Sequence, residues 1–95
     1  MKEFFGITHT GVKSFLYTIC CGGITAVISD YGATLVKLFV PDRDGNTDDV
    51  ILGHDSPTDY FNSTCFFGST IGRSANRIRN ASFKLNGKTY QLTPN

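Results

Sequence analysis

The chain has 95 residues, of which 40% are hydrophobic and 18% charged, and its formal net charge is +1. A chain of this length forms one small domain with a limited core, and this composition is typical of a water-soluble globular protein. No apolar run approaches the length of a transmembrane span, and the first residues lack the apolar core of a secretion signal, so we expect no membrane association.

Acidic and basic residues are unevenly distributed along the chain. Residues 1–60 contain all eight acidic and four of the nine basic residues, a formal charge of −4, whereas residues 61–95 contain five basic residues and no acid, a charge of +5. A basic segment of this kind can bind nucleic acid or phosphate. Because the whole chain is nearly neutral, we instead expect two halves of one fold with complementary charge, and no nucleic-acid partner.

The first half of the chain contains three segments typical of β-strands. Residues 15–21 (FLYTICC) are rich in aromatic and β-branched residues, and Gly22-Gly23 connects them to residues 24–29 (ITAVIS), which predicts a β-hairpin. Residues 33–40 (ATLVKLFV) predict a third strand with one buried face, which ends at the following proline because proline cannot donate a ladder hydrogen bond.

Turn and loop signals dominate the middle of the chain. Residues 41–46 (PDRDGN) have the composition of a tight turn, and residues 49–53 (DVILG) predict a short apolar strand after it. Residues 54–64 predict a loop that can contain one helical turn beginning at Ser56. Residues 65–72 (CFFGSTIG) are apolar but interrupted by glycines, and predict a buried irregular segment.

The last predicted element is a second hairpin. Residues 82–85 (SFKL) and 88–92 (KTYQL) alternate in character and flank Asn86-Gly87, the pair preferred in a type I′ turn. Together the elements predict an all-β, antiparallel fold, with residues 1–95 as a single segment. A unit this small must cover its edge strands, so we expect it to be the first part of a larger structure, or to self-associate through open sheet edges.

Three cysteines, Cys20, Cys21 and Cys65, have neither the number nor the spacing of a zinc site or a disulfide framework. Neighbouring residues of a strand point to opposite faces, so Cys20 and Cys21 face apart. We expect reduced cysteines that serve mainly in packing, in a cytoplasmic protein.

Two histidines and an acidic cluster are further candidates for chemistry. His54 precedes Asp55, a combination used in acid–base catalysis, and His9 lies in a glycine- and threonine-rich stretch. Adjacent residues in a loop rarely orient each other, so we expect surface or packing roles for both histidines. The acidic cluster at 42–49 resembles a calcium loop but lacks its closing glutamate, so we interpret it as a solvated turn and expect no metal or cofactor.

The stretch GRSANRI (residues 72–78) places two arginines and an asparagine among aromatic and β-branched residues. A guanidinium is costly to bury without acceptors, so these side chains either lie at the surface or meet a polar ligand. Asn76 offers donors and an acceptor, and Arg77 offers a rigid fork of donors, which suits a ligand with many hydroxyl groups, such as a sugar. Judged from their spacing alone, such residues more often have a structural role than a ligand-binding role.

Five motifs, taken in order, resemble the N-terminal part of the aldose 1-epimerase, or galactose mutarotase, family. They are YGAT (31–34), VPDRDG (40–45), DVILG (49–53), FFGSTIGRSANRI (66–78) and FKLNGKTYQL (83–92). The resemblance covers nearly all of the chain and is weakest at its start. It implies an antiparallel β-sandwich (the galactose mutarotase-like supersandwich) several times longer than this chain. Such enzymes interconvert the α and β anomers of hexoses, such as galactose and glucose, without a metal or an organic cofactor.

The resemblance also implies which residues take part. In the family, a histidine and a glutamate beyond the ANRI motif act as acid and base, and none of His9, His54 and Glu3 matches them. The resemblance therefore implies no catalytic residue in this chain. It implies that Asn76 and Arg77 bind sugar, and that Arg73 has a structural partner.

Two other functions are compatible with the sequence. The first is a non-catalytic carbohydrate-binding module on the same scaffold. The second, which we favour least, is a nucleic-acid binder that uses the basic segment and stacks bases on aromatic rings, whereas we expect those rings in the core. The rings concerned are Phe66, Phe67, Phe83 and Tyr90.

Overall fold

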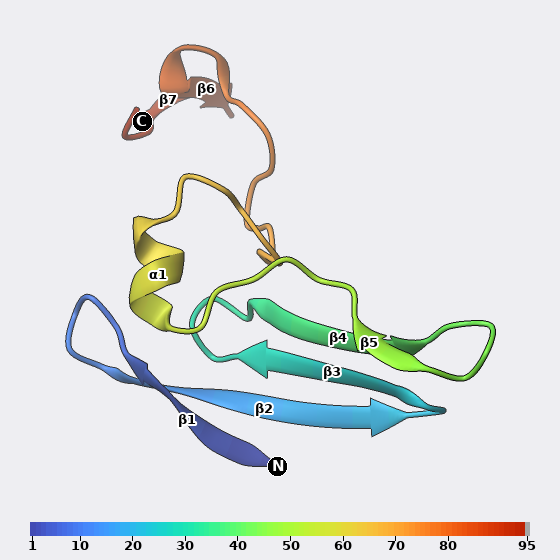
Figure 1. The fold of residues 1–95 in the computed structure, drawn as a ribbon. Helices are drawn as coiled ribbons and strands as arrows, with labels where there is room; N and C mark the ends of the chain where they lie inside the picture. The colour runs from blue at the N-terminus through green and yellow to red at the C-terminus, as the bar shows by residue number, and fades with distance from the viewer. Residues whose placement is uncertain (95) are drawn as a thin grey trace.

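The computed structural model describes residues 1–94, and its regular structure is mainly antiparallel β-sheet (Figure 1). One sheet contains five strands in chain order: β1 (Lys2–Ile7), β2 (Lys13–Cys21), β3 (Ile24–Ser29), β4 (Leu35–Pro41) and β5 (Thr47–Asp49). The helix α1 (Pro57–Asn62) and the short 3₁₀ helix η1 (Arg79–Ala81) come next. A separate two-stranded sheet follows them and contains β6 (Ser82–Leu85) and β7 (Lys88–Gln91). The predicted all-β, antiparallel architecture is confirmed.

Both predicted hairpins are present. β2 pairs with β3 around Gly22 and Gly23, whose φ angles of 57° and 84° lie in the left-handed region that favours glycine. β6 pairs with β7 around Asn86 and Gly87, whose φ angles are 52° and 77°. Positive φ at both central residues is the signature of a type I′ turn, so the asparagine–glycine prediction is confirmed.

The acidic cluster forms the turn between β4 and β5, as expected. The carboxylate of Asp42 accepts hydrogen bonds from the backbone N–H groups of Asp44 and Asn46, both at 2.9 Å. Aspartate commonly closes turns in this way, by bonding to the backbone two residues ahead.

The strand predicted at residues 49–53 is wrong, because β5 ends at Asp49. The carboxylate of Asp49 accepts hydrogen bonds from the N–H groups of Leu38, at 3.0 Å, and Ile51, at 3.1 Å. The Asp49 side chain thus takes two backbone N–H groups that a longer strand would pair with backbone carbonyls. The strand is therefore limited to Thr47–Asp49.

The strand β1 was not predicted from the sequence. This strand pairs with β2, but the register shifts between Phe4 and Gly6, which interrupts the regular alternation that would have signalled a strand. Phe4 packs edge-to-face on Phe15 of β2, with ring centroids 5.9 Å apart.

The helix α1 begins where a helical turn was expected and packs against β1. The Ser56 hydroxyl accepts a hydrogen bond from the N–H of Asp59 at 3.2 Å and caps the helix, and Pro57 occupies the first turn. Pro57 is buried against Gly6, where a Cβ would lie 2.8 Å from the proline ring. The Tyr60 ring also contacts Phe5, at 6.2 Å between centroids. In residues 1–94 no helix has the length and apolarity needed to cross a bilayer.

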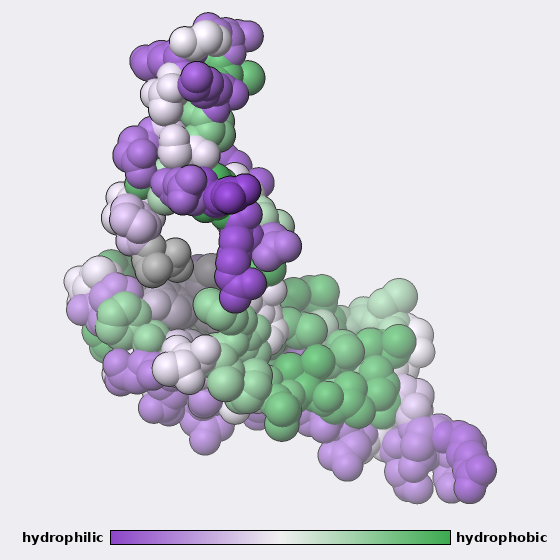
Figure 2. All heavy atoms as spheres, turned by 90° about the horizontal axis from the view of Figure 1, so that it is seen from above, coloured by the Kyte–Doolittle hydropathy of each residue, from purple (hydrophilic) through white to green (hydrophobic). Residues whose placement is uncertain are grey.

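The hydrophobic core is small. Leu16, Val27 and Val36 are buried, and Phe5, Phe39 and Tyr60 pack against them. Figure 2 shows a continuous apolar band on one face of the molecule, beside a hydrophilic loop. Much apolar surface therefore lies outside the core, including Ile19 with 59% of its surface exposed.

The cysteines do not serve in packing, contrary to our expectation. Cys20, Cys21 and Cys65 are all exposed, and all three thiols are free. Cys20 and Cys21 lie in the last residues of β2, beyond its buried positions, which explains their exposure.

A buried polar cluster fixes the turn between β3 and β4. The Ser14 hydroxyl donates to the carboxylate of Asp30 at 2.9 Å and lies 3.1 Å from the hydroxyl of Ser29. The Thr34 hydroxyl donates to the carbonyl of Tyr31 at 2.8 Å. Because these buried hydroxyls are all paired, the turn is held in one conformation next to the segment that leads to Asn76 and Arg77.

Candidate functional site

Asn76 and Arg77 line one groove, of about 1160 Å³. Its walls come from the segment after α1, from η1 and from the residues that follow β7. The lining residues are Phe66, Thr70, Ile71, Gly72, Ser74, Asn76, Arg77, Ile78, Asn80, Ala81, Leu92, Thr93 and Pro94. The two residues predicted to bind sugar are thus brought together, whereas Arg73 of the same motif does not line the groove.

Polar and apolar residues contribute about equally to the lining of the groove. Phe66 and Ile71 are 82% and 64% exposed, so the prediction that residues 65–72 are buried is wrong. The segment is irregular, as expected, but Phe66 and Ile71 line the groove instead of entering the core. Small-molecule sites usually have mainly apolar walls with a few polar groups, and this groove is more polar than that.

Asn76 has a φ angle of 65°, in the left-handed region. Asparagine enters this region more easily than most residues, because its short polar side chain can bond locally. Asparagine is therefore a favourable residue for the left-handed conformation at position 76.

Two hydrogen bonds fasten the segment that carries Asn76 and Arg77 to the main sheet; we call this pair the clasp. The N–H of Leu35 donates to the carbonyl of Gly68 at 2.9 Å, and the hydroxyl of Thr70 donates to the carbonyl of Ala33 at 2.7 Å. Gly68 has a φ of 63°, and a Cβ at this position would overlap the carbonyl oxygen of Leu35. The clasp thus depends on the close approach of two backbones that only glycine allows.

The clasp was not predicted from the sequence. The available signal was Gly68 itself, because a glycine inside an apolar run often marks a close backbone approach. The partner of that glycine, the turn before β4, is distant in the sequence and could not be inferred from it.

His54 is enclosed by aromatic rings. Its ring lies edge-to-face on Tyr60 at 4.9 Å and stacks on Phe67 at 5.5 Å between centroids. Its Nε2 atom and the Tyr60 hydroxyl are buried, and neither has a hydrogen-bond partner among residues 1–94. The expected packing role is confirmed. His54 does not line the groove.

The Tyr60 hydroxyl gives a testable prediction. Because an unpaired buried hydroxyl destabilises a fold, Tyr60→Phe should raise the free energy of unfolding by about 1 kcal/mol. Tyr17→Phe is the matched control, because Tyr17 is 41% exposed, and should change stability by less than about 0.5 kcal/mol. Urea unfolding followed by circular dichroism measures both. A loss of stability in Tyr60→Phe would mean that this hydroxyl has a partner in solution.

His9 also packs on aromatic rings. It stacks on Phe61 at 3.7 Å between centroids and lies edge-to-face on Tyr31, whose hydroxyl is 3.5 Å from His9 Nδ1. It does not line the groove. The structure therefore brings neither histidine to Asn76 and Arg77.

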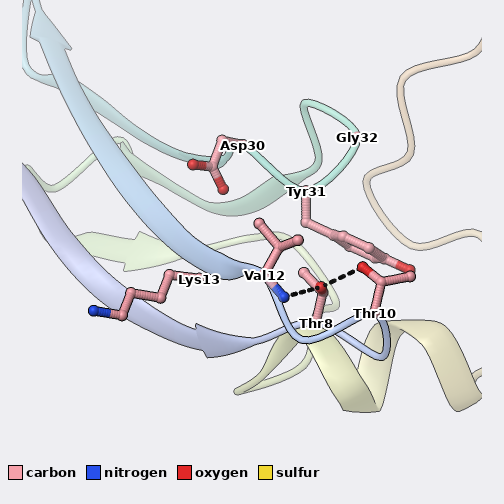
Figure 3. Close-up of a pocket in the computed structure, with 7 residues that line it drawn as sticks. All are labelled: Thr8, Thr10, Val12, Lys13, Asp30, Tyr31 and Gly32. Atoms are coloured by element: carbon pink, nitrogen blue, oxygen red, sulfur yellow. Dashed lines mark hydrogen bonds between the residues drawn. The ribbon is translucent and has the colours of Figure 1, made fainter.

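A second, smaller cup of about 370 Å³ lies at the loop between β1 and β2 (Figure 3). The hydroxyls of Thr8 and Thr10 lie 3.0 Å apart, and Thr8 also accepts a hydrogen bond from the N–H of Val12 at 3.1 Å. Figure 3 shows that Lys13 extends away from these hydroxyls. The bonds of Thr8 and Thr10 therefore stabilise the loop between β1 and β2.

A comparison with known families shows the family to which the chain belongs. The family model described as aldose 1-epimerase matches residues 16–95. The chain belongs to the aldose 1-epimerase family. A probable aldose 1-epimerase of Arthroderma benhamiae is 49% identical over 84 residues, which are 84% of this chain and 19% of that protein. The galactose mutarotase of Bos taurus is 43% identical over 68 residues, which are 72% of this chain and 20% of that protein.

The fold agrees with the family. A GalM/aldose epimerase homologue from C. elegans superimposes with a TM-score of 0.76 at 40% identity, covering 86% of this chain and 26% of the homologue. The expected galactose mutarotase-like fold class is thereby confirmed. The chain spans about a fifth of the length of the curated aldose 1-epimerases and mutarotases that it matches.

Proposed function

We propose that this chain supplies part of the hexose pocket of an aldose 1-epimerase. Asn76 and Arg77 would bind hydroxyl groups of the sugar, and the acid and the base of the reaction would come from outside these 95 residues. The proposal covers hexoses such as galactose and glucose.

One observation carries this proposal. Among the described residues that line the groove, Arg77 is the sole charged side chain, and none is an aspartate, glutamate, histidine, lysine, tyrosine or cysteine. Arginine stays protonated in proteins, so it donates hydrogen bonds but does not transfer protons. The groove can thus hold and orient hydroxyl groups, and its lining offers no group for acid–base catalysis.

The reaction we propose for the whole enzyme needs two proton transfers. A base takes the proton of the anomeric hydroxyl while an acid protonates the ring oxygen, and the ring opens to the aldehyde. Rotation about the bond to the aldehyde carbon, followed by ring closure, gives the other anomer. The guanidinium of Arg77 would fix the sugar for these steps through hydrogen bonds to its hydroxyls.

The alternative is a carbohydrate-binding module without catalysis, which the same groove supports. The two functions differ in affinity. Half of an enzyme pocket should bind galactose more weakly than about 1 mM, since only a few hydrogen bonds offset the loss of ligand freedom. A binding module should bind more tightly than that, without turnover.

Galactose titration and polarimetry test the proposal together. We expect the chain to leave the mutarotation rate of freshly dissolved α-galactose unchanged, and to bind galactose weakly through residues 76–78 in nuclear magnetic resonance titrations. Arg77→Ala should weaken that binding about tenfold or more, the effect of losing a hydrogen bond to a charged donor.

Arg73→Ala is the matched control. It removes the same charge from the same motif, outside the groove, and should leave the affinity unchanged. Equal losses in both variants would point to a general effect of charge and refute the assignment of Arg77. Acceleration of mutarotation by the chain, abolished in Arg77→Ala, would show that these residues hold their own acid and base.

A further inference from the structure

One carbonyl group joins two walls of the groove at the base of the β6–β7 hairpin. The carbonyl of Ala81, in η1, accepts a hydrogen bond from the N–H of Leu92 at 2.7 Å and another from the side-chain Nε2 of Gln91 at 3.1 Å. The same Nε2 atom also donates to the carbonyl of Leu92 at 3.1 Å. Ala81 and Leu92 both line the groove. The Gln91 amide therefore fastens the wall that follows β7 to the wall formed by η1.

The backbone on the η1 side of this contact is strained. Asn80 and Ala81 have φ angles of 57° and 49°, in the left-handed region. Asparagine enters this region easily, whereas the Cβ of alanine crowds the neighbouring carbonyl oxygen there. An alanine in this conformation must be held by its surroundings. The two hydrogen bonds to the Ala81 carbonyl are contacts of this kind.

The conformation of Ala81 sets how the two walls face each other. The chain reaches η1 directly after Asn76 and Arg77, and then enters β6 (Figure 1). A rotation at Ala81 would redirect the chain at this point and change the distance between Arg77 on one wall and Leu92 on the other. Gln91 does not line the groove, so it acts from outside the space that a ligand would occupy.

We propose that Gln91 is a positioning residue of the hexose groove. Its amide holds Ala81 in the left-handed conformation, and thereby keeps the two walls at the spacing that the sugar requires. This inference rests on the proposed function, because it takes the groove as the hexose site. Glutamine suits the role, since its amide nitrogen has two hydrogens and can donate to both carbonyls at once.

Galactose titration of Gln91→Ala tests the inference. Without the amide, Ala81 returns part of the time to the negative φ that alanine prefers, and fewer molecules have a competent groove. Galactose binding at residues 76–78, followed by nuclear magnetic resonance, should weaken about fivefold. The chemical shifts of Leu85 and Lys88, at the far end of the hairpin, should stay unchanged and show that the hairpin remains folded.

Thr89→Ala is the matched control. It removes a polar side chain from the same strand, and Thr89, like Gln91, does not line the groove. This variant should bind galactose with the affinity of the wild type. An equal loss of affinity in both variants would overturn the inference, because any truncation on β7 would then suffice.

The double variant Ala81→Gly, Gln91→Ala provides a rescue. Glycine populates positive and negative φ about equally, so the double variant should bind galactose within about twofold of the wild type. A side chain that bound the sugar itself could not be replaced by a glycine at position 81. An affinity as low as that of Gln91→Ala alone would therefore overturn the positioning role.

The wild type separates a failure of this inference from a failure of the proposed function. A wild-type chain without galactose-dependent shifts at residues 76–78 would refute the proposed function, and the role of Gln91 with it. Binding by the wild type that Gln91→Ala leaves unchanged would refute the role of Gln91 alone.

Discussion

Replacing Gly68 with alanine is expected to open the clasp and to release the segment that carries Asn76 and Arg77. A left-handed φ costs alanine about 1–2 kcal/mol, and the new methyl group would also overlap the carbonyl oxygen of Leu35. The backbones must therefore separate, which breaks the hydrogen bond from Leu35 N–H to the Gly68 carbonyl. We expect the Leu35 amide to exchange its hydrogen at least about 100-fold faster, equivalent to about 3 kcal/mol.

Gly22→Ala separates the overlap from the backbone strain. Gly22 has a φ of 57°, close to the 63° of Gly68, but a Cβ there meets no atom within 4 Å. This variant should bear only the backbone strain, which should speed amide hydrogen exchange about tenfold. The Leu35 amide should be affected no more than other amides of the sheet. If both variants changed Leu35 exchange equally, the close approach at Gly68 would not exist in solution.

The outcome at Gly68 also bears on function. If Asn76 and Arg77 bind hexose only when the clasp holds their segment, Gly68→Ala should abolish galactose binding while the β2–β3 amides keep their protection. Thr70→Val offers a milder test, because it removes one hydrogen bond of the clasp without adding volume. Galactose binding that survives an open clasp would show that the segment binds on its own.

Local signals predicted much of the fold. The Gly22-Gly23 and Asn86-Gly87 turns, the cap at Ser56 and the turn at Asp42 each follow from residues close in the chain, and each is present. The errors arose where a side chain or a distant backbone competes with the local pattern. Asp49 ends β5 by taking two backbone donors with its carboxylate, which the apolar run DVILG does not reveal.

The candidate site was predicted only as a pair of residues. The donors and acceptors of Asn76 and Arg77 suggested a hydroxyl-rich ligand, and the structure places both residues in one groove. The sequence could not reveal the apolar part of the groove's lining, because Phe66 and Ile71 in an apolar run predict burial in the core. Nor could it reveal the enclosure of His54 by rings from two other segments.

Leu16→Ala should have the largest effect on the stability of the sheet. Leu16 is one of three buried hydrophobic residues among those described, and it is 7% exposed. Truncating a buried leucine typically costs about 3 kcal/mol, through lost burial and the cavity left behind. Since a domain of this size has about 5–10 kcal/mol of stability in total, the midpoint of urea unfolding should fall by a third or more.

Ile19→Ala is the control on the same strand, since Ile19 is 59% exposed and an exposed aliphatic side chain should cost about 1 kcal/mol or less. The two variants should differ by about 2 kcal/mol when measured at about 10 µM. If Ile19→Ala cost as much as Leu16→Ala, its face of β2 would be covered in solution. A repeat at about 1 mM would then show whether a second copy covers it, because stabilisation by a partner grows with concentration whereas burial within one chain does not.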